Sequence, residues 1–216
     1  CGRIETPPRL VAVSKFHPST SILEAYINGH QRVFGENYVA ELCEKATAIQ
    51  QGGQAPDIEW HFIGHLQSNK CKQLVNNCPG LAVIETVDSI HLAKQLDKAW
   101  CASPAGQQKR LKVMVQINTS LEENKSGCKQ EDVAQLVSAI KNEFKGLELI
   151  GLMTIGESGE ASRDFQTLCQ CKQKLGSEFS GLELSMGMSG DFELAIKMGS
   201  TNVRVGSSIF GARPIH

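Results

Sequence analysis

Short apolar runs alternate with longer amphipathic segments along the 216 residues of this chain. A short run rich in Val, Ile and Leu and bounded by turn residues is typical of a strand that is buried on both faces. Eight such runs predict strands over residues 9–15, 33–37, 58–64, 81–87, 111–117, 147–155, 182–186 and 203–205, the last extending towards Phe210.

Between these runs, apolar residues recur at the spacing of an amphipathic helix. Pro18-Ser19-Thr20 and Asp88-Ser89 are signals for helix starts, and Gly52-Gly53 is a signal for a helix end. The pattern predicts helices through Leu23, through Ala46, through Leu66 and Leu74, through Leu92, and over residues 131–144, 164–175 and 191–198.

Eight strands that alternate with helices, without a tight hairpin signal, predict an α/β fold with a single parallel (β/α)8 TIM barrel. A doubly wound open sheet is the alternative, but it usually has fewer strands, and no Gly-x-Gly-x-x-Gly follows the first strand. No linker divides the chain, so we expect one domain over residues 1–216. The helix expected before the first strand is missing and the chain opens with Cys1-Gly2-Arg3, so we expect a truncated amino terminus.

Charge and composition exclude several classes of partner. The 22 Lys and Arg residues nearly balance the 23 Asp and Glu residues, so no overall field attracts nucleic acid or an anionic membrane. No apolar stretch approaches the roughly 20 residues of a membrane span. The eight cysteines are scattered, which indicates a reduced intracellular compartment.

His61 and His65 share a face of a predicted strand, as a pair of metal ligands could. Histidines in the core or at its edge with satisfied hydrogen bonds are the more common case, so we predict no metal site.

Lys15 ends the first apolar run and is the strongest single candidate for chemistry. In barrel and open-sheet α/β folds, the carboxyl ends of the strands carry the active site. A partly desolvated lysine there has a lowered pKa and can form a Schiff base with a carbonyl group. The alternative is a lysine whose head group simply reaches water.

Two segments rich in glycine and serine follow the seventh and eighth strands, at residues 186–190 and 204–208. In barrels this is the usual phosphate site, because backbone N–H groups and hydroxyls bind the anion there. A reactive lysine opposite such a site indicates a phosphorylated carbonyl compound. Arg204 lies on the eighth strand and faces either the barrel mouth or a core carboxylate.

The segments 13–15, 34–38, 60–67, 151–155, 185–189 and 199–206 resemble the pyridoxal phosphate homeostasis protein family, and the resemblance extends from Arg9 to Arg213. It implies the barrel of the alanine racemase N-terminal domain and pyridoxal 5′-phosphate as cofactor. It also implies roles for seven residues: Lys15 as the Schiff-base lysine, Ser189, Gly206 and Ser207 at the phosphate, Arg204 facing the pyridine nitrogen, and Asn37 and Met153 along the ring.

Three functions remain open: a carrier of pyridoxal phosphate without turnover, an amino-acid racemase or decarboxylase, and a Schiff-base aldolase for a sugar phosphate. We favour the carrier and predict no catalytic residue, because neither Tyr26 nor Tyr38 lies where a second catalytic acid is expected. Such a carrier in vitamin B6 homeostasis would contact pyridoxal-phosphate-dependent apoenzymes transiently. We expect a monomer in the cytoplasm, with mitochondria as a further location.

Overall fold

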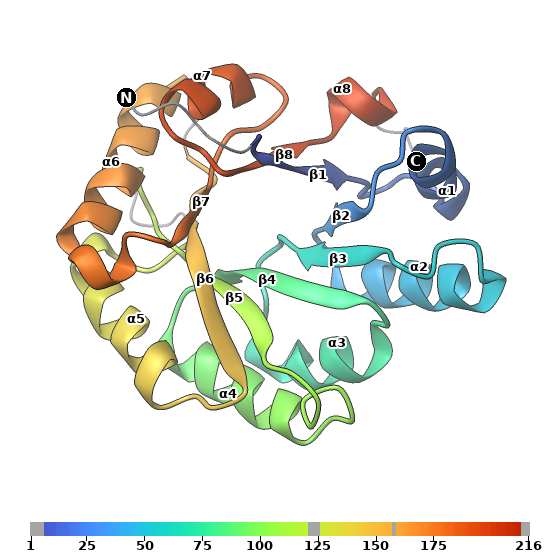
Figure 1. Ribbon diagram of the computed structural model, residues 1–216, viewed down its shortest axis with the longest axis horizontal. Coiled ribbons are helices and arrows are strands. Elements are labelled where there is room, and N and C mark those ends of the chain that lie inside the picture. The colour runs from blue at the N-terminus through green and yellow to red at the C-terminus, as the bar shows by residue number, and fades with distance from the viewer. Residues whose placement is uncertain (1–6, 121–125, 157–158, 213–216) are drawn as a thin grey trace.

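The barrel predicted from the alternating pattern is present in the computed structural model, which describes residues 7–120, 126–156 and 159–212. Eight parallel strands form a closed barrel in which each strand pairs with the next and β1 pairs with β8 (Figure 1). The expected single parallel (β/α)8 architecture is therefore confirmed. The opening Cys1-Gly2-Arg3 lies outside the described residues.

The strands are short, and most of them end one or two residues before the end of the apolar run that predicts them. Closure is fixed by the pairing of Val11 with Arg204 and of Ala12 with Val205. The strands are β1 (Arg9–Val13), β2 (Val33–Glu36), β3 (Glu59–Phe62), β4 (Leu81–Val87), β5 (Leu111–Gln116), β6 (Leu147–Met153), β7 (Glu183–Ser185) and β8 (Asn202–Val205).

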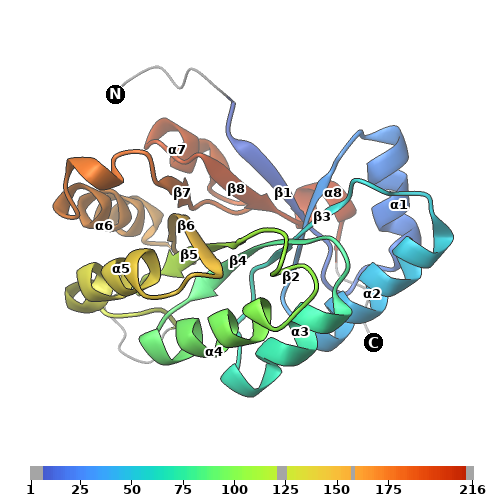
Figure 2. The ribbon, with the colours of Figure 1, turned by 60° about the horizontal axis from the view of Figure 1, so that its bottom comes forward.

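Helices surround the barrel as an outer ring, which Figures 1 and 2 show from two directions. Ser89 caps its helix as predicted, because its hydroxyl accepts a hydrogen bond from the Leu92 N–H. The helices are α1 (Ser19–Asn28), α2 (Val39–Gly52), α3 (Cys71–Asn77), α4 (Ile90–Cys101), α5 (Val133–Asn142), α6 (Ala161–Lys174), α7 (Phe192–Lys197) and α8 (Ser207–Phe210), with 3-10 turns η1 (Ser68–Lys70), η2 (Gln130–Asp132) and η3 (Ser177–Phe179).

Two sequence predictions about element ends are wrong. The eighth strand does not extend towards Phe210, because the chain turns at Gly206 and enters the short helix α8. Leu66 precedes its helix, because Gln67 has an extended backbone and the 3-10 turn η1 begins only at Ser68. Both errors fall where the chain leaves a strand at the carboxyl end.

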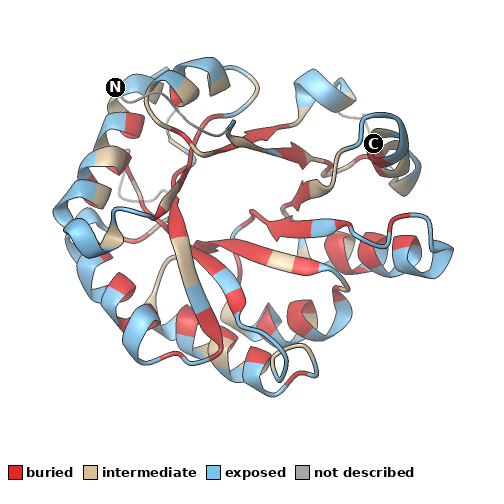
Figure 3. Cartoon of the chain, in the orientation of Figure 1, coloured by how far each residue is buried: buried red, intermediate tan, exposed pale blue. Residues whose placement is uncertain are grey.

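The main core lies between the strands and the helices, and it contains Trp60 and Trp100 as its largest fully buried side chains. A second, smaller cluster of Val83, Met114 and Met153 lies apart from it. Figure 3 shows buried residues on the strands and on the inner faces of the helices, with exposed residues on the outer faces. Among the described residues, no helix is long and apolar enough to cross a membrane.

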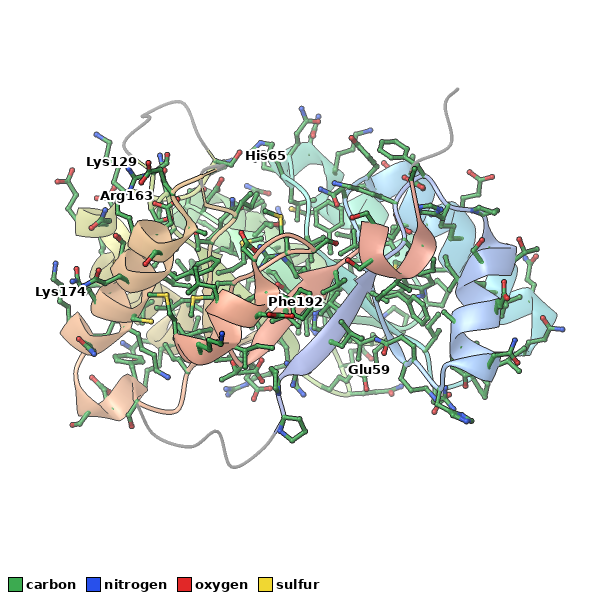
Figure 4. The ribbon with its side chains drawn as sticks, turned by 90° about the horizontal axis from the view of Figure 1, so that it is seen from above. Glu59, His65, Lys129, Arg163, Lys174 and Phe192 are labelled. Carbon is green, nitrogen blue, oxygen red and sulfur yellow. The ribbon has the colours of Figure 1, made fainter. Side chains whose placement is uncertain are left out.

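Because all strands are parallel, their carboxyl ends share one end of the barrel. Figure 4 places Glu59, at the start of β3, and His65, just past its end, at opposite ends of the molecule. The side chains that follow the strands therefore meet at the end where His65 lies.

Candidate functional site

A cavity of about 350 Å³ opens at the carboxyl end of the barrel, within the size range of small-ligand pockets. Residues at or just after the ends of β1, β2, β3, β6, β7 and β8 line it. All seven residues singled out from the sequence are among them: Lys15, Asn37, Met153, Ser189, Arg204, Gly206 and Ser207. The structure brings these residues together, and their contact with a cofactor stays a prediction.

Lys15 lies in the turn that follows β1 and lines the cavity together with Val13, the last residue of that strand. The Ser14 N–H still donates to the Gly35 carbonyl oxygen at 3.0 Å, so the backbone stays attached to β2 up to the residue before the lysine. Phe16, the residue after Lys15, has a left-handed backbone with φ of 67°, which is uncommon for a residue with a side chain. The chain therefore turns sharply immediately after the lysine.

Lys45 of α2 anchors the segment on which Lys15 lies. Its Nζ donates to the carbonyl oxygen of Ser14 at 2.8 Å and to carboxylate oxygens of Glu36 and Glu41, each at 2.7 Å. Glu41 Oε1 also accepts the Phe16 N–H at 2.6 Å, so it holds the residue with left-handed backbone. One buried ammonium group thus links the peptide before Lys15 to the peptide after it.

Glu36 is fully buried beside this ammonium group. Burial raises the pKa of Glu36 above its ordinary value, although Lys45 and the Ser14 hydroxyl act in the opposite direction. The Ser14 hydroxyl donates to Glu36 Oε1 at 2.7 Å, while Oε2 has no hydrogen-bond partner among the described residues.

The end of the cavity near β7 and β8 offers small polar groups. The Gly206 N–H donates to the Ser189 hydroxyl at 3.1 Å, which joins the two glycine- and serine-rich segments. Ser207 begins α8 and is exposed. A Cβ at Gly206 would lie 3.3 Å from the Val13 carbonyl oxygen, so a larger residue would crowd β1. Hydroxyls and close backbone of this kind suit an anion such as phosphate.

Arg204 lies at the inner wall of the cavity and is almost completely buried. Its Nη1 donates to the Ser185 hydroxyl at 2.6 Å, and its Nη2 donates to the Thr154 carbonyl oxygen at 2.8 Å. Burial lowers the pKa of Arg204, although the carboxylates of Glu85 and Asp191 act in the opposite direction. An arginine stays protonated in such surroundings, so the site holds a fixed positive charge.

Glu85 lies behind Arg204 with both carboxylate oxygens hydrogen-bonded. Its Oε1 is 2.6 Å from His61 Nδ1 and accepts from Asn202 Nδ2 at 3.0 Å, and its Oε2 accepts from the Ser185 hydroxyl at 2.5 Å. Burial opposes ionisation, but the hydrogen bond and charge of His61, the charge of Arg204 and the Ser185 hydroxyl outweigh it. They lower the pKa of Glu85 to about 2.

Asn37 offers a direct test of whether the cavity fits a polar ligand. Its side-chain Oδ1 is buried and has no hydrogen-bond partner among the described residues, although Asn37 lines the cavity. Orphaned buried acceptors are uncommon and costly, so a donor from a ligand would be favourable here. The backbone of Asn37 is packed tightly against Gly64, where a Cβ would lie 1.9 Å from the Asn37 carbonyl oxygen.

Sequence reasoning missed some residues and mispaired others. His17 is buried, lines the cavity and stacks on Phe210 at 5.1 Å, but it follows the turn at Phe16, for which the sequence has no signal. His61 and His65 do not share a strand face, because β3 ends at Phe62 and His65 is exposed. Among the described residues, no group of three potential metal ligands comes together.

The chain matches the family model described as alanine racemase, N-terminal domain, over residues 2–214. It is 50% identical over 215 residues to a pyridoxal phosphate homeostasis protein of Bos taurus, covering 95% of this chain and 77% of that protein. The structure of PipY from Synechococcus elongatus PCC7942 with PLP bound has a TM-score of 0.78 and 33% identity, covering 97% of this chain and 96% of PipY.

An alanine racemase from Corynebacterium glutamicum shares the barrel but little sequence. Its structure has a TM-score of 0.64 and 17% identity, covering 97% of this chain and 57% of that protein. This likeness concerns the fold alone.

Proposed function

The chain belongs to the pyridoxal phosphate homeostasis protein family, and from this premise we propose that it binds pyridoxal 5′-phosphate on Lys15 and serves vitamin B6 homeostasis without catalytic turnover. The observation that carries the proposal is that Lys15, a fixed arginine and the serine-rich end line the same cavity. PipY, a relative that covers nearly the whole chain, has been solved with PLP bound, which supports the choice of cofactor.

When bound, pyridoxal phosphate supplies an aldehyde that reacts with amines and a ring that stabilises negative charge. The chain would supply the amine of Lys15 as the group that holds the cofactor through its aldehyde. Lys45 and Glu41 hold the backbone on both sides of the lysine and so keep its Cα in a fixed place.

The remaining lining residues would orient the cofactor. Ser189, Ser207 and the backbone at Gly206 would hold the phosphate, as their hydroxyls and N–H groups suit an anion. Arg204 would face the ring nitrogen and disfavour a proton there, because two positive charges would then lie together. Asn37 would use its unpaired Oδ1 to accept a hydrogen bond.

The absence of turnover is proposed on the distribution of ionisable groups. Among the described residues that line the cavity, the ionisable ones are Lys15, His17 and Arg204. Lys15 and His17 come from the same segment after β1, and Arg204 does not release its proton. Exchange of an α-proton on the two faces of an amino acid needs a base on each side, and each acid–base group typically contributes 10²–10⁴-fold. Tyr26 and Tyr38 do not line the cavity.

His17 keeps a racemase as the second candidate, because it places a second titratable side chain in the cavity. The two candidates differ in one measurement. A carrier should bind pyridoxal phosphate and give no racemisation of alanine or other amino acids above the rate of free cofactor. Racemisation that disappears in Lys15→Ala and falls in His17→Asn would favour the enzyme. An aldolase would instead cleave a sugar phosphate and bind no pyridoxal phosphate.

A carrier needs an accessible site. Ile155 and Met188 line the cavity and are 44% and 39% exposed, so its mouth carries apolar groups at the surface. We propose that pyridoxal-phosphate-dependent apoenzymes contact this mouth transiently. The monomeric state and the cytoplasmic or mitochondrial location stay predictions.

Equilibrium binding of pyridoxal phosphate, followed by visible absorbance, tests the proposal. Wild type and Lys129→Ala should bind equally, because Lys129 is an exposed lysine at the same end of the barrel (Figure 4). Lys15→Ala should lose the absorbance band of the bound cofactor. Equal bands in all three proteins would contradict the assignment of Lys15.

A further inference from the structure

A chain of buried polar groups continues from the cavity into the barrel interior and uses residues to which the proposed function gives no role. These hydrogen bonds connect Arg204 of β8 to Ser185 of β7 and Ser185 to Glu85 of β4. Glu85 also contacts His61 of β3. We propose that Glu85 is a positioning residue of the cofactor site, which holds Arg204 in place through the Ser185 hydroxyl. This inference rests on the proposed function, because Arg204 is the residue assigned to the ring nitrogen.

The geometry gives the Ser185 hydroxyl one direction. Arg204 can only donate hydrogen bonds, so the hydroxyl accepts from its Nη1 at 2.6 Å. The hydroxyl must then donate its own proton to Glu85 Oε2, which is 2.5 Å away. The carboxylate thereby fixes the hydroxyl rotor, and the fixed rotor presents a lone pair to the guanidinium.

The charges of Arg204 and Glu85 also indicate that Glu85 positions Arg204. Arg204 and Glu85 are 4% and 0% exposed, so water does little to screen either group. A buried charge is costly unless an opposite charge is near and its hydrogen bonds are made. Asp191 also attracts Arg204, but its Oδ1 accepts the Met188 N–H at 2.6 Å and Asp191 is only partly buried. Glu85 is therefore the buried counter-charge of Arg204.

The strands around Glu85 depart from regular pairing. Ile84 pairs with Val113 and Val87 pairs with Val115, so two residues of β4, Glu85 and Thr86, oppose one residue of β5. Extra residues of this kind redirect side chains and are frequent next to functional sites. The pairing of β3 with β4 also shifts between Trp60 and His61. The strand pairing is thus irregular at Glu85 and directly before His61.

The two acceptors of the Arg204 guanidinium show how Glu85 would act on its orientation. With Nη1 on Ser185 and Nη2 on the Thr154 carbonyl, the guanidinium has one orientation at the cavity wall. Without the carboxylate, the Ser185 hydroxyl can rotate, and the guanidinium loses both its counter-charge and one fixed acceptor. The cofactor would then bind more weakly, and its ring nitrogen would meet a less well placed positive charge.

The test compares Glu85→Gln, Ser185→Ala and the control Thr86→Val. Gln keeps the shape of Glu85 but replaces an acceptor oxygen with a donor, while Ser185→Ala removes only the bridging hydroxyl. Thr86 is the neighbouring residue of β4, also buried, and its hydroxyl has no hydrogen-bond partner among the described residues. Melting curves without cofactor identify any variant that does not fold. If Glu85→Gln does not fold, Ser185→Ala alone tests the positioning role.

We expect Glu85→Gln and Ser185→Ala to bind pyridoxal phosphate about 10- to 100-fold more weakly, the range known for partners one step removed from a metal ligand. Both should also shift the absorption spectrum of the bound cofactor and its dependence on pH, and Thr86→Val should change neither. In an Arg204→Gln background, Glu85→Gln should have a smaller effect, because coupled residues are not additive.

Wild-type affinity and an unchanged spectrum in folded Glu85→Gln or Ser185→Ala would overturn the inference while leaving the proposed function intact. Full additivity with Arg204→Gln would overturn it as well. A wild-type protein that binds no pyridoxal phosphate would contradict the proposed function itself, so the two failures are distinguishable.

Discussion

Replacing Lys45 with methionine should show how strongly the fold depends on the ammonium group behind Lys15. The substitution keeps the length of the side chain but removes three hydrogen bonds, to Ser14, Glu36 and Glu41. It leaves the carboxylate of Glu36 fully buried without a cation. Removal of one partner from a buried ion pair costs about 3–5 kcal/mol, and we expect a loss of this size in the free energy of unfolding near neutral pH.

The cost of Lys45→Met should depend on pH in one direction. Burial raises the pKa of Glu36 in the folded state, so the folded protein holds this proton more tightly than the unfolded chain does. The stability that Glu36 contributes is present in acid and is lost as pH rises through its folded pKa. Without Lys45 the pKa of Glu36 rises further, so the cost should be larger at about pH 8 than at about pH 5.

Urea denaturation at the two pH values measures this cost, with Lys72→Met, an exposed lysine of α3, as the control. The double variant Lys45→Met with Glu36→Gln should regain part of the lost stability, because it leaves no unpaired charge. A cost below about 1 kcal/mol, or one that is equal at both pH values, would refute the reasoning.

Three further predictions concern the cavity and the residues behind it. The double variant Ser189→Ala with Ser207→Ala should weaken binding of pyridoxal phosphate but not of pyridoxal, which lacks the phosphate; equal weakening of both ligands in titrations would remove the phosphate assignment. Gly64→Ala should lower the free energy of unfolding by about 1–3 kcal/mol in urea, because its Cβ would lie 1.9 Å from the Asn37 carbonyl oxygen, and unchanged stability would contradict this packing. The pKa of Glu85 is lowered from 4.5 to about 2, so it contributes about 3 kcal/mol of stability above the higher value, which is lost as pH falls through the lower one. Acid titration should therefore show a flatter loss of stability in Glu85→Gln, whereas identical slopes would contradict the lowered pKa.

The sequence was sufficient for the barrel and for placing six of the seven lining residues at its mouth, because both depend on short-range patterns, whereas Met153 came from the family resemblance alone. Apolar runs define the strands, and the carboxyl ends of parallel strands must meet at one end of the barrel. Lys15, Asn37 and Arg204 could thus be placed at one mouth although they are far apart in the chain. Their individual contacts with the cofactor came from the family resemblance and stay predictions.

The buried polar groups could not be predicted, because their partners lie far apart in sequence. Glu85 meets Ser185 and Asn202 at separations of 100 and 117 residues, and no local pattern encodes such pairs. Lys45 lies on an amphipathic helix, where a lysine ordinarily indicates the solvent face. Only the tertiary structure shows that its ammonium group is buried against Glu36.

The central claim is that Lys15 forms the covalent bond to pyridoxal phosphate, and borohydride reduction followed by peptide mass analysis tests it most directly. Reduction converts the imine into a stable amine and fixes the cofactor on the lysine that held it. The account predicts loss of the visible band and the mass of the reduced cofactor on the peptide that contains Lys15. The same mass on a different lysine, or a reconstituted protein with no reducible band, would contradict it.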